Sequence, residues 1–357
     1  MADRTPRSTI YAGSAHWGSG PAGQSPGGLF RRTVGDDLWE PLTRGLPERA
    51  EIRALAVHPA DPLVVYAGTQ DGPYRSLDRG GHWERLDFPD PGMVVWSILV
   101  HPHNPRTLYL GTAPAAVYRS DDGGDTWHRL PNAKPLERVQ MTFPTRVTRL
   151  AADPSNPDEL YAALEVGGVM RSPDGGESWT DCSLDLVKLA DRPHLKSRIV
   201  SNTDMEGMLD AHALCLSGAR PGVVFLALRM GLFRSADRGT SWEDMEIRHF
   251  SPLTYARDVQ VAPHDARVLF ACLSPAARSE EGTLYRSNDL GQTWTRFDRG
   301  VKARSTMMAV ALDRRDPDRV YCATRTGQVF GTQDGGNSWQ EYPLPASTED
   351  VYVVACG

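Results

Sequence analysis

The stretch YRSDDGGDTW, residues 118–127, brings a serine, aspartates, two glycines and a tryptophan together in one short segment. Its tryptophan recurs along the chain at intervals of 44 to 63 residues, which is the range of a four-stranded propeller blade with insertions. The other copies are RSLDRGGHW (75–83), RSPDGGESW (171–179), RSADRGTSW (234–242), RSNDLGQTW (286–294), GTQDGGNSW (331–339) and the degenerate RRTVGDDLW (31–39).

Two apolar segments precede each motif. The first ends in a polar turn, as in IRALAVHPADP (52–62), and the second follows at once, as in VVYAGTQDG (64–72). Nearly continuous apolar runs of this length are typical of inner strands that are covered on both faces. Each repeat therefore predicts strands A, B and C, then the motif as a turn, then strand D.

The motif itself is expected to build the frame of the protein. Serine and aspartate side chains can bond to backbone amides inside the C–D turn, and glycine supplies a positive φ. The tryptophan then begins strand D. Because the motif recurs in every blade, it provides no single focus for catalysis.

The two ends of the chain complete one blade. Residues 8–17, 27–32 and 38–42 supply strands B, C and D without a preceding strand A, and VYVVACG (351–357) is an isolated apolar strand. Closure by both ends leaves no exposed sheet edge. We predict an all-β, seven-bladed propeller over 1–357, with the C-terminal strand innermost in the first blade. The blades are expected at 8–48 plus 350–357, 49–90, 92–136, 144–190, 208–250, 253–300 and 305–347, with a rim insertion at 191–207.

The repeated motif resembles the S-x-D-x-G-x-[ST]-W signature of the Asp-box (BNR) repeat. Bacterial sialidases, the sortilin ectodomain and photosystem II assembly factors carry this repeat, so the resemblance implies a propeller and permits either an enzyme or a receptor. Sialidases also have an arginine in a [FY]-R-I-P motif ahead of the first repeat. The nearest match here, SRIV at Arg198-Ile199, lies far downstream and has no proline, which disfavours sialidase activity.

Composition narrows the class of partner and the location. The chain has 357 residues, 40% of them apolar and 24% charged, which suits a soluble globular protein. Its net charge of −6 argues against a nucleic-acid or anionic-membrane surface. The N-terminus has no signal-peptide pattern, and four of the five cysteines lie in apolar runs without metal-ligand spacing. A cytoplasmic location is expected.

A functional site is expected where strand A begins and strand B ends, because both points lie on one face around the central channel. The expected A-strand starts are Arg53, Trp96, Thr148, His212, Arg257, Met308 and Tyr352. The expected B-strand ends are Ala15-His16-Trp17, Gln70, Ala113, Glu165, Arg229, Ser274 and Arg325. Long loops at 15–28, 132–146, 191–212 and 274–282 favour a walled pocket on the same rim.

Arginines and tryptophans in this ring suggest a ligand. Bidentate arginine contacts suit a carboxylate or phosphate, and a network of arginines with acidic partners is the alternative. Tryptophan stacks well on sugar or aromatic rings, and channel packing is its alternative. The candidate ligand-binding residues are Arg53, Trp96, Arg229, Arg257, Arg325, His16 and Trp17.

Three further residues are the catalytic candidates. His212, Glu165 and Asp210 could form a general acid/base set, and His16, Glu165 and His212 could hold a divalent metal as cofactor. A hydrogen-bonded histidine of the channel wall is the structural alternative for His212. The sequence thus leaves two functions open. One is a hydrolase or lyase acting on an anionic or sugar-like small molecule. The other is a non-catalytic scaffold that docks a partner protein.

Overall fold

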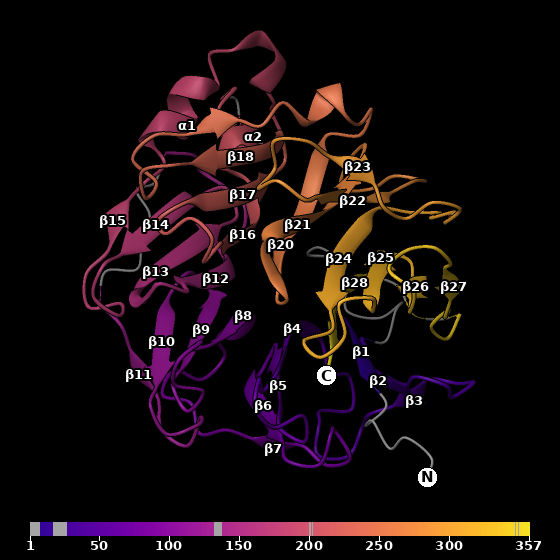
Figure 1. Cartoon of the computed structure of the whole chain (residues 1–357). Helices are drawn as coiled ribbons and strands as arrows, with labels where there is room; N and C mark the ends of the chain where they lie inside the picture. Colours follow the sequence, from indigo (N-terminus) through magenta and orange to yellow (C-terminus); the bar gives the residue numbers. More distant parts are fainter. Residues whose placement is uncertain are drawn as a thin grey trace.

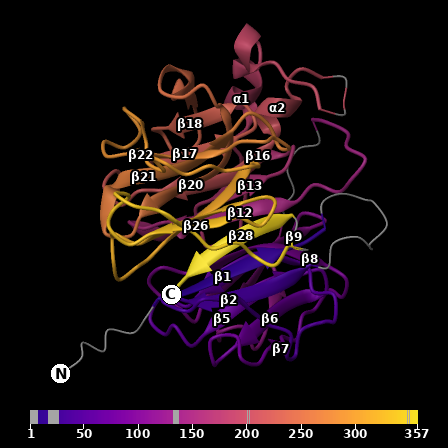
Figure 2. The ribbon, with the colours of Figure 1, turned by 90° about the vertical axis from the view of Figure 1, so that its right-hand side faces the viewer.

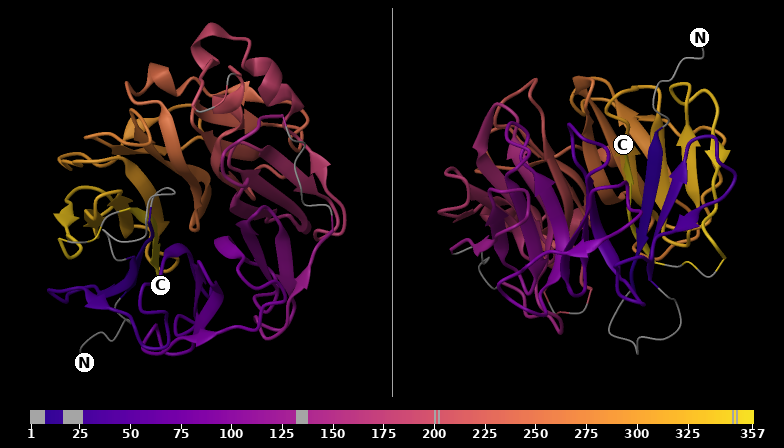
Figure 3. Two further views of the ribbon diagram at one scale, coloured as in Figure 1. Left: turned by 180° about the vertical axis from the view of Figure 1, so that it is seen from behind. Right: turned by 90° about the horizontal axis from the view of Figure 1, so that it is seen from below.

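The computed structural model describes residues 8–16, 27–131, 138–199, 201, 203–346, 348 and 350–357. Seven four-stranded antiparallel sheets stand around a central axis, as Figure 1 and the view from behind in Figure 3 show. The prediction of an all-β, seven-bladed propeller is confirmed.

The first four blades follow the chain, except that the last strand belongs to the first blade. Blade one contains β28 (Val351–Cys356), β1 (Thr9–Ser14), β2 (Gly28–Thr33) and β3 (Glu40–Pro41). Blade two contains β4 (Ile52–Val57), β5 (Val65–Thr69), β6 (Gly72–Ser76) and β7 (Glu84–Arg85). Blade three contains β8 (Val94–Val100), β9 (Leu108–Ala113), β10 (Val117–Ser120) and β11 (His128–Arg129). Blade four contains β12 (Val147–Asp153), β13 (Asn156–Leu164), β14 (Gly168–Ser172) and β15 (Thr180–Asp181).

The remaining three blades repeat this order. Blade five contains β16 (Ala211–Leu216), β17 (Val224–Leu228), β18 (Gly231–Ser235) and β19 (Glu243–Asp244). Blade six contains β20 (Tyr255–Ala262), β21 (Asp265–Ser274), β22 (Thr283–Ser287) and β23 (Thr295–Arg296). Blade seven contains β24 (Met307–Leu312), β25 (Val320–Thr324), β26 (Val329–Thr332) and β27 (Gln340–Glu341).

The ring is closed by β28, which pairs antiparallel with β1 as the innermost strand of blade one. The nitrogen of Thr9 donates to the Gly357 oxygen at 2.8 Å, and the Gly357 nitrogen donates to the Thr9 oxygen at 3.0 Å. Figure 2 shows β28 beside β1, with β2 below them. This pairing satisfies the inner edge of β1, which an open array would expose.

The core consists of seven buried clusters, one at each seam between neighbouring blades. At the first seam, Tyr11 from blade one packs with Ile52 and Trp83 from blade two. Neighbouring blades approach closely near the axis, where a Cβ on Gly68 would lie 2.6 Å from the Val95 Cγ1 atom. Small residues in the second strand of a blade are therefore required by the convergence of the blades.

The Asp-box motif forms a closed set of bonds within its own turn. In the copy at 118–127, the Ser120 hydroxyl donates to Asp122 at 2.7 Å and accepts from the Gly124 nitrogen at 2.9 Å. Asp122 also accepts from the Thr126 nitrogen at 3.0 Å. The other five good copies repeat the pattern, with threonine replacing serine at position 332. The serine and aspartate are used to hold the turn, as expected for a frame.

In the part of the chain that the structure describes, four short helical segments depart from the predicted all-strand pattern. They are α1 (Leu184–Leu189), α2 (Glu206–Leu209), and the 3-10 helices η1 (Pro193–Leu195) and η2 (Ile247–His249). Leu186 and Met208 are fully buried in the cluster between blades four and five, so α1 and α2 cover that seam. Figure 1 shows both at the outer margin of the ring. No helix in the described ranges is both long enough and apolar enough to cross a bilayer.

Candidate functional site

One β-bulge interrupts the inner strand of every blade at the same place. In β4 the register jumps from Ile52 to Ala54, which leaves Arg53 as the extra residue between two paired neighbours. A bulge re-aims the side chain of the extra residue and is frequent next to active sites. The seven extra residues are Arg53, Trp96, Thr148, His212, Arg257, Met308 and Tyr352. We call this set the bulge ring.

The bulge ring lies on the central channel. All seven of its side chains line a cavity of about 300 Å³ that follows the inner strands. The same residues were expected from the sequence as A-strand starts. The structure adds the physical reason, because an extra residue in each strand turns one side chain out of the regular alternation.

A second ring is formed by the residues that precede each bulge residue by two positions in the sequence. Its members are Glu51, Val94, Arg146, Asp210, Tyr255, Thr306 and Asp350. The expected strand ends Glu165, Arg229 and Arg325 donate their backbone nitrogens to Arg146, Asp210 and Thr306, so the strand ends adjoin this ring. Glu51, Arg146, Tyr255 and Asp350 were not predicted from the sequence as site residues. Reading two positions upstream of each bulge residue would have found them.

Glu165 has an unusual electrostatic environment. Its carboxylate lies 2.8 Å from an Arg146 nitrogen, and each side chain is 22% exposed. Burial raises the pKa of Glu165 from 4.5 to about 7. The charges of Arg146 and Arg257 oppose this rise, whereas the negative charge of Asp210 adds to it. The Glu165 carboxyl therefore exchanges its proton near neutral pH.

Asp210 shows the opposite behaviour. Burial alone would raise its pKa, but the charge of His212 and those of two arginines outweigh that effect and hold the pKa below its usual value. Its Oδ2 atom lies 3.4 Å from His212 Nε2 and 4.0 Å from an Arg229 nitrogen. Glu165 and Asp210 are thus two neighbouring carboxyl groups whose pKa values are shifted in opposite directions, upward for Glu165 and downward for Asp210.

His212 is held in one orientation. Its Nδ1 atom lies 2.7 Å from the carbonyl oxygen of Ala256, and this acceptor requires a proton on Nδ1. The Tyr255 hydroxyl lies 3.3 Å from Nε2, and the Asp210 carboxylate lies 3.4 Å from the same nitrogen. The bond to Ala256 joins blades five and six, so the structural alternative for His212 is realised. Its contact with Asp210 also links His212 to the cluster of charged side chains formed by Asp210 and the neighbouring arginines.

Trp96 is enclosed by cations. The guanidinium carbon of Arg146 lies 4.4 Å from the centre of its ring and that of Arg53 lies 4.9 Å away. Tyr352 makes an edge contact with the same ring at 5.6 Å. Arg53 is also paired with Glu51 at 2.5 Å. The predicted alternative of channel packing therefore describes Trp96 better than an open stacking face.

The other predicted arginines take different partners. Arg325 is paired with Asp350 at 2.5 Å. The Nε atom of Arg229 lies 3.4 Å from the Ser197 hydroxyl, which brings the rim insertion to the channel mouth. Arg257 lines the cavity among the charges of Glu165 and Asp210. The arginine network with acidic partners is therefore present.

A salt bridge crosses the channel below the mouth. Arg149 on β12 reaches Asp258 on β20 at 2.8 Å, passing the strand β16 that lies between them in the ring. The buried Asp258 also accepts from the Val310 nitrogen at 3.1 Å and from Gln260 at 3.0 Å. Residues farther along, such as Val57, Val100 and Leu312, are apolar. The Arg149–Asp258 pair lies between the bulge ring and this more apolar stretch, whose lining also includes Gln260 and Arg314.

The remaining candidates give no metal site. His16 is described and its Nε2 atom is buried, whereas Trp17 lies outside the described residues. Within the described ranges, no three histidine, cysteine, aspartate or glutamate side chains are grouped as a metal ion would require. The geometry therefore gives no support to a metal held by His16, Glu165 and His212.

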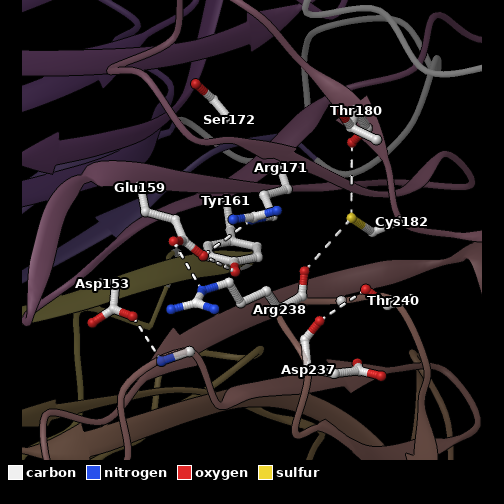
Figure 4. A network of polar contacts seen from close by, with 12 residues as sticks. Asp153, Glu159, Tyr161, Arg171, Ser172, Thr180, Cys182, Asp237, Arg238 and Thr240 are labelled. Atoms are coloured by element: carbon white, nitrogen blue, oxygen red, sulfur yellow. Dashed lines mark hydrogen bonds and ion pairs between the residues drawn. The ribbon is translucent and has the colours of Figure 1, made fainter.

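A second buried polar group lies outside the channel, at the seam between blades four and five (Figure 4). Glu159 accepts from Tyr161 at 2.5 Å, lies 3.0 Å from Arg171 and lies 3.2 Å from Arg238 of the next blade. Burial tends to raise the pKa of Glu159, but these partners outweigh it and the pKa is lowered. Glu159 is therefore a buried glutamate outside the channel whose partners keep its pKa low, in contrast to Glu165.

Two family models match parts of the chain. The BNR/Asp-box repeat model matches residues 118–129, and the model for sortilin, neurotensin receptor 3, matches residues 282–355. The six hydrogen-bonded copies of the turn and the closed ring of seven blades show the same repeat along the chain. This chain is an Asp-box repeat propeller.

The Asp-box propeller is similar to xyloglucanases and to YCF48. A xyloglucanase of Hypocrea jecorina (strain QM6a) is 24% identical over 355 residues, covering 91% of this chain and 37% of that protein. The solved GH74 xyloglucanase from Xanthomonas campestris has a TM-score of 0.63 at 20% identity, covering 98% of this chain and 52% of that one. YCF48 from Cyanidioschyzon merolae has a TM-score of 0.56 at 15% identity, covering 86% and 90%. The likeness to the two structures establishes the fold, and the chain spans about a third to a half of the xyloglucanases.

Proposed function

We propose that the Asp-box propeller binds a sugar-like or anionic small molecule at the channel mouth and cleaves it as a hydrolase or lyase. In this proposal Glu165 is the general acid and Asp210, aligned by His212, is the general base. The observation that carries it is the pair of neighbouring carboxyl groups with opposite pKa shifts. Environments that push two titratable groups apart in this way assign an acid and a base.

The chemistry follows from the two protonation states. With a pKa of about 7, Glu165 keeps a proton that it can give to the leaving oxygen as the bond to the sugar carbon breaks. Asp210 stays ionised and can accept a proton from an attacking water, so that hydrolysis leaves both products neutral at the cleaved bond. In a lyase, the same base would take a proton from carbon.

The walls of the mouth suit a polar ligand. Arg229 is 25% exposed at the rim, and its guanidinium can form two parallel bonds to a carboxylate. Arg325 is 17% exposed and is engaged by Asp350. Of the two ligand classes, the similarity to xyloglucanases supports a sugar over an anionic small molecule. We retain the cytoplasm as the proposed location, supported by five cysteines that are all free thiols.

The experiment is turnover of an oligosaccharide panel that includes neutral xyloglucan fragments and fragments bearing uronic acids. Glu165→Gln and Asp210→Asn should each lower kcat by about 100-fold or more, because each removes a proton-transfer group. Glu159→Gln, a buried glutamate away from the channel, should leave kcat unchanged. Incorporation of oxygen-18 from labelled water would identify a hydrolase, and its absence from the product would identify a lyase.

A non-catalytic binding scaffold is the second candidate. It is favoured by the ion pairs at the channel mouth, because Arg53, Arg146 and Arg325 each already have a carboxylate partner within the chain. Saturable binding of an oligosaccharide without turnover, unaffected by Glu165→Gln, would select this candidate and reject the enzyme.

A further inference from the structure

Strand C of most blades presents an arginine to a carboxylate. In three blades the partner is the residue directly opposite on strand D, as in Arg75–Glu84 and Arg234–Glu243, both at 2.7 Å. Arg31–Glu40 follows the same rule at 2.6 Å. Arg119 and Arg171 instead use Asp121 and Glu159. The arginine at this position is therefore neutralised in blades one to five.

Blade six breaks this rule. Its arginine, Arg286, lies opposite Thr295, which cannot form an ion pair. Within the described part of the chain the guanidinium of Arg286 has no hydrogen-bond or ion-pair partner, and its Nε atom is buried. Its guanidinium carbon lies 5.7 Å from the ring centre of Phe270 and 5.6 Å from that of Phe297. Aromatic contacts hold the cation in place without neutralising its charge.

The same blade lacks a second group of the repeat. The hydroxyls of Tyr66 and Tyr109 donate to the Asp-box turn of the following blade at 3.0 and 3.2 Å. At the corresponding position blade six has Phe270, which has no hydroxyl. A cavity of about 60 Å³ is present at this seam between blades six and seven, lined by Phe270 and Arg286 among others. We call it the seam cavity.

The acidic residues of the seam cavity are already occupied. The Asp313 carboxylate accepts from the Ser8 hydroxyl and from the Arg315 nitrogen. Asp265 accepts from the Arg267 nitrogen at 2.9 Å. A second arginine of the cavity, Arg319, is paired with Asp316 at 3.0 Å, and His264 Nε2 lies 2.9 Å from the Asp313 carbonyl oxygen. Among the described residues, Arg286 therefore remains as the lining arginine without an ion-pair partner, and Pro263, Leu312 and Pro317 supply an apolar part of the wall.

We propose that the seam cavity is a binding site for a small carboxylate. A guanidinium offers two parallel donors to such a group, and the apolar wall suits a short alkyl chain. At roughly 10–15 Å³ for each water-sized group, the cavity has room for about four or five non-hydrogen atoms. Acetate and propionate have this size. The site is separate from the channel mouth and does not depend on its function.

The test uses propionate as the probe and propionamide as its neutral isostere. Ligand-observed NMR titrations are made at constant ionic strength on the whole chain. Saturable binding of propionate, with weaker binding of propionamide, is expected. Failure of propionate to saturate would overturn the proposal, as would equal binding of the amide or binding of inorganic phosphate in preference to propionate.

Matched variants locate the site. Arg286→Gln should weaken propionate binding at least about tenfold, because it removes the charged donor. Thr295→Glu supplies the ion-pair partner found in other blades and should weaken binding by a similar factor while keeping the arginine. The control Arg234→Gln removes the equivalent, already paired arginine of blade five and should leave binding unchanged. Equal effects of the Arg286 and Arg234 variants would refute the assignment, and thermal unfolding of each variant verifies that it is folded.

Discussion

Replacing Glu165 with glutamine should change how the stability of the Asp-box propeller depends on pH. The pKa of this carboxyl is about 7 in the folded chain against an ordinary value of 4.5. At 1.36 kcal/mol per pKa unit, this difference corresponds to about 3 kcal/mol. The folded state holds a proton on Glu165 that the unfolded state has lost over this range, so the contribution of Glu165 to the wild-type stability falls as the pH rises from 4.5 to about 7.

The glutamine variant has no such proton and lacks this dependence. The free energy of unfolding of Glu165→Gln minus that of the wild type should therefore increase by about 2.5 kcal/mol between about pH 5 and pH 8. The variant also leaves Arg146 without its ionic partner, but Arg146 stays charged throughout this range. That loss adds a constant offset and does not alter the slope.

Urea-induced unfolding at a series of pH values measures this slope. Glu159→Gln is the control, because the pKa of Glu159 is lowered. Its stabilising contribution is present above the ordinary glutamate value and is lost only as the pH falls, so its difference from the wild type should be flat between about pH 5 and pH 8. A flat difference for Glu165→Gln as well would refute the assignment of a raised pKa, and with it the proposed general acid.

Two further predictions concern the frame and the channel. Ser120→Ala should lower the free energy of unfolding by about 1–3 kcal/mol, since it leaves the buried Gly124 nitrogen without its acceptor, and urea unfolding would contradict this if the loss were negligible. His212→Asn should retain most of the stability that His212→Ala loses, because an amide can still donate to the Ala256 oxygen. Equal destabilisation by the two substitutions would show that this bond does not account for the role of the histidine in packing.

The repeat made part of the candidate site predictable from the sequence. Each A-strand start could be located because the repeat aligns the blades, and all seven of these residues line the cavity. The site residues that were not predicted, such as Arg146 and Tyr255, have local sequences that do not resemble one another. Arg146 follows a long loop and Tyr255 begins a strand, so only the ring formed two residues before the bulges relates them.

The amino-acid sequence alone determined the number of blades, the turn that joins their outer strands and the closure by the last strand. These features depend on short-range patterns, namely the periodic Asp-box and the apolar runs, which repeat in every blade. The electrostatics of Glu165 and the uncompensated charge of Arg286 were decided only by the tertiary structure. Both depend on which distant side chains meet across a seam or the channel, and a pKa is set by burial and by charges close in space, whatever their separation along the chain.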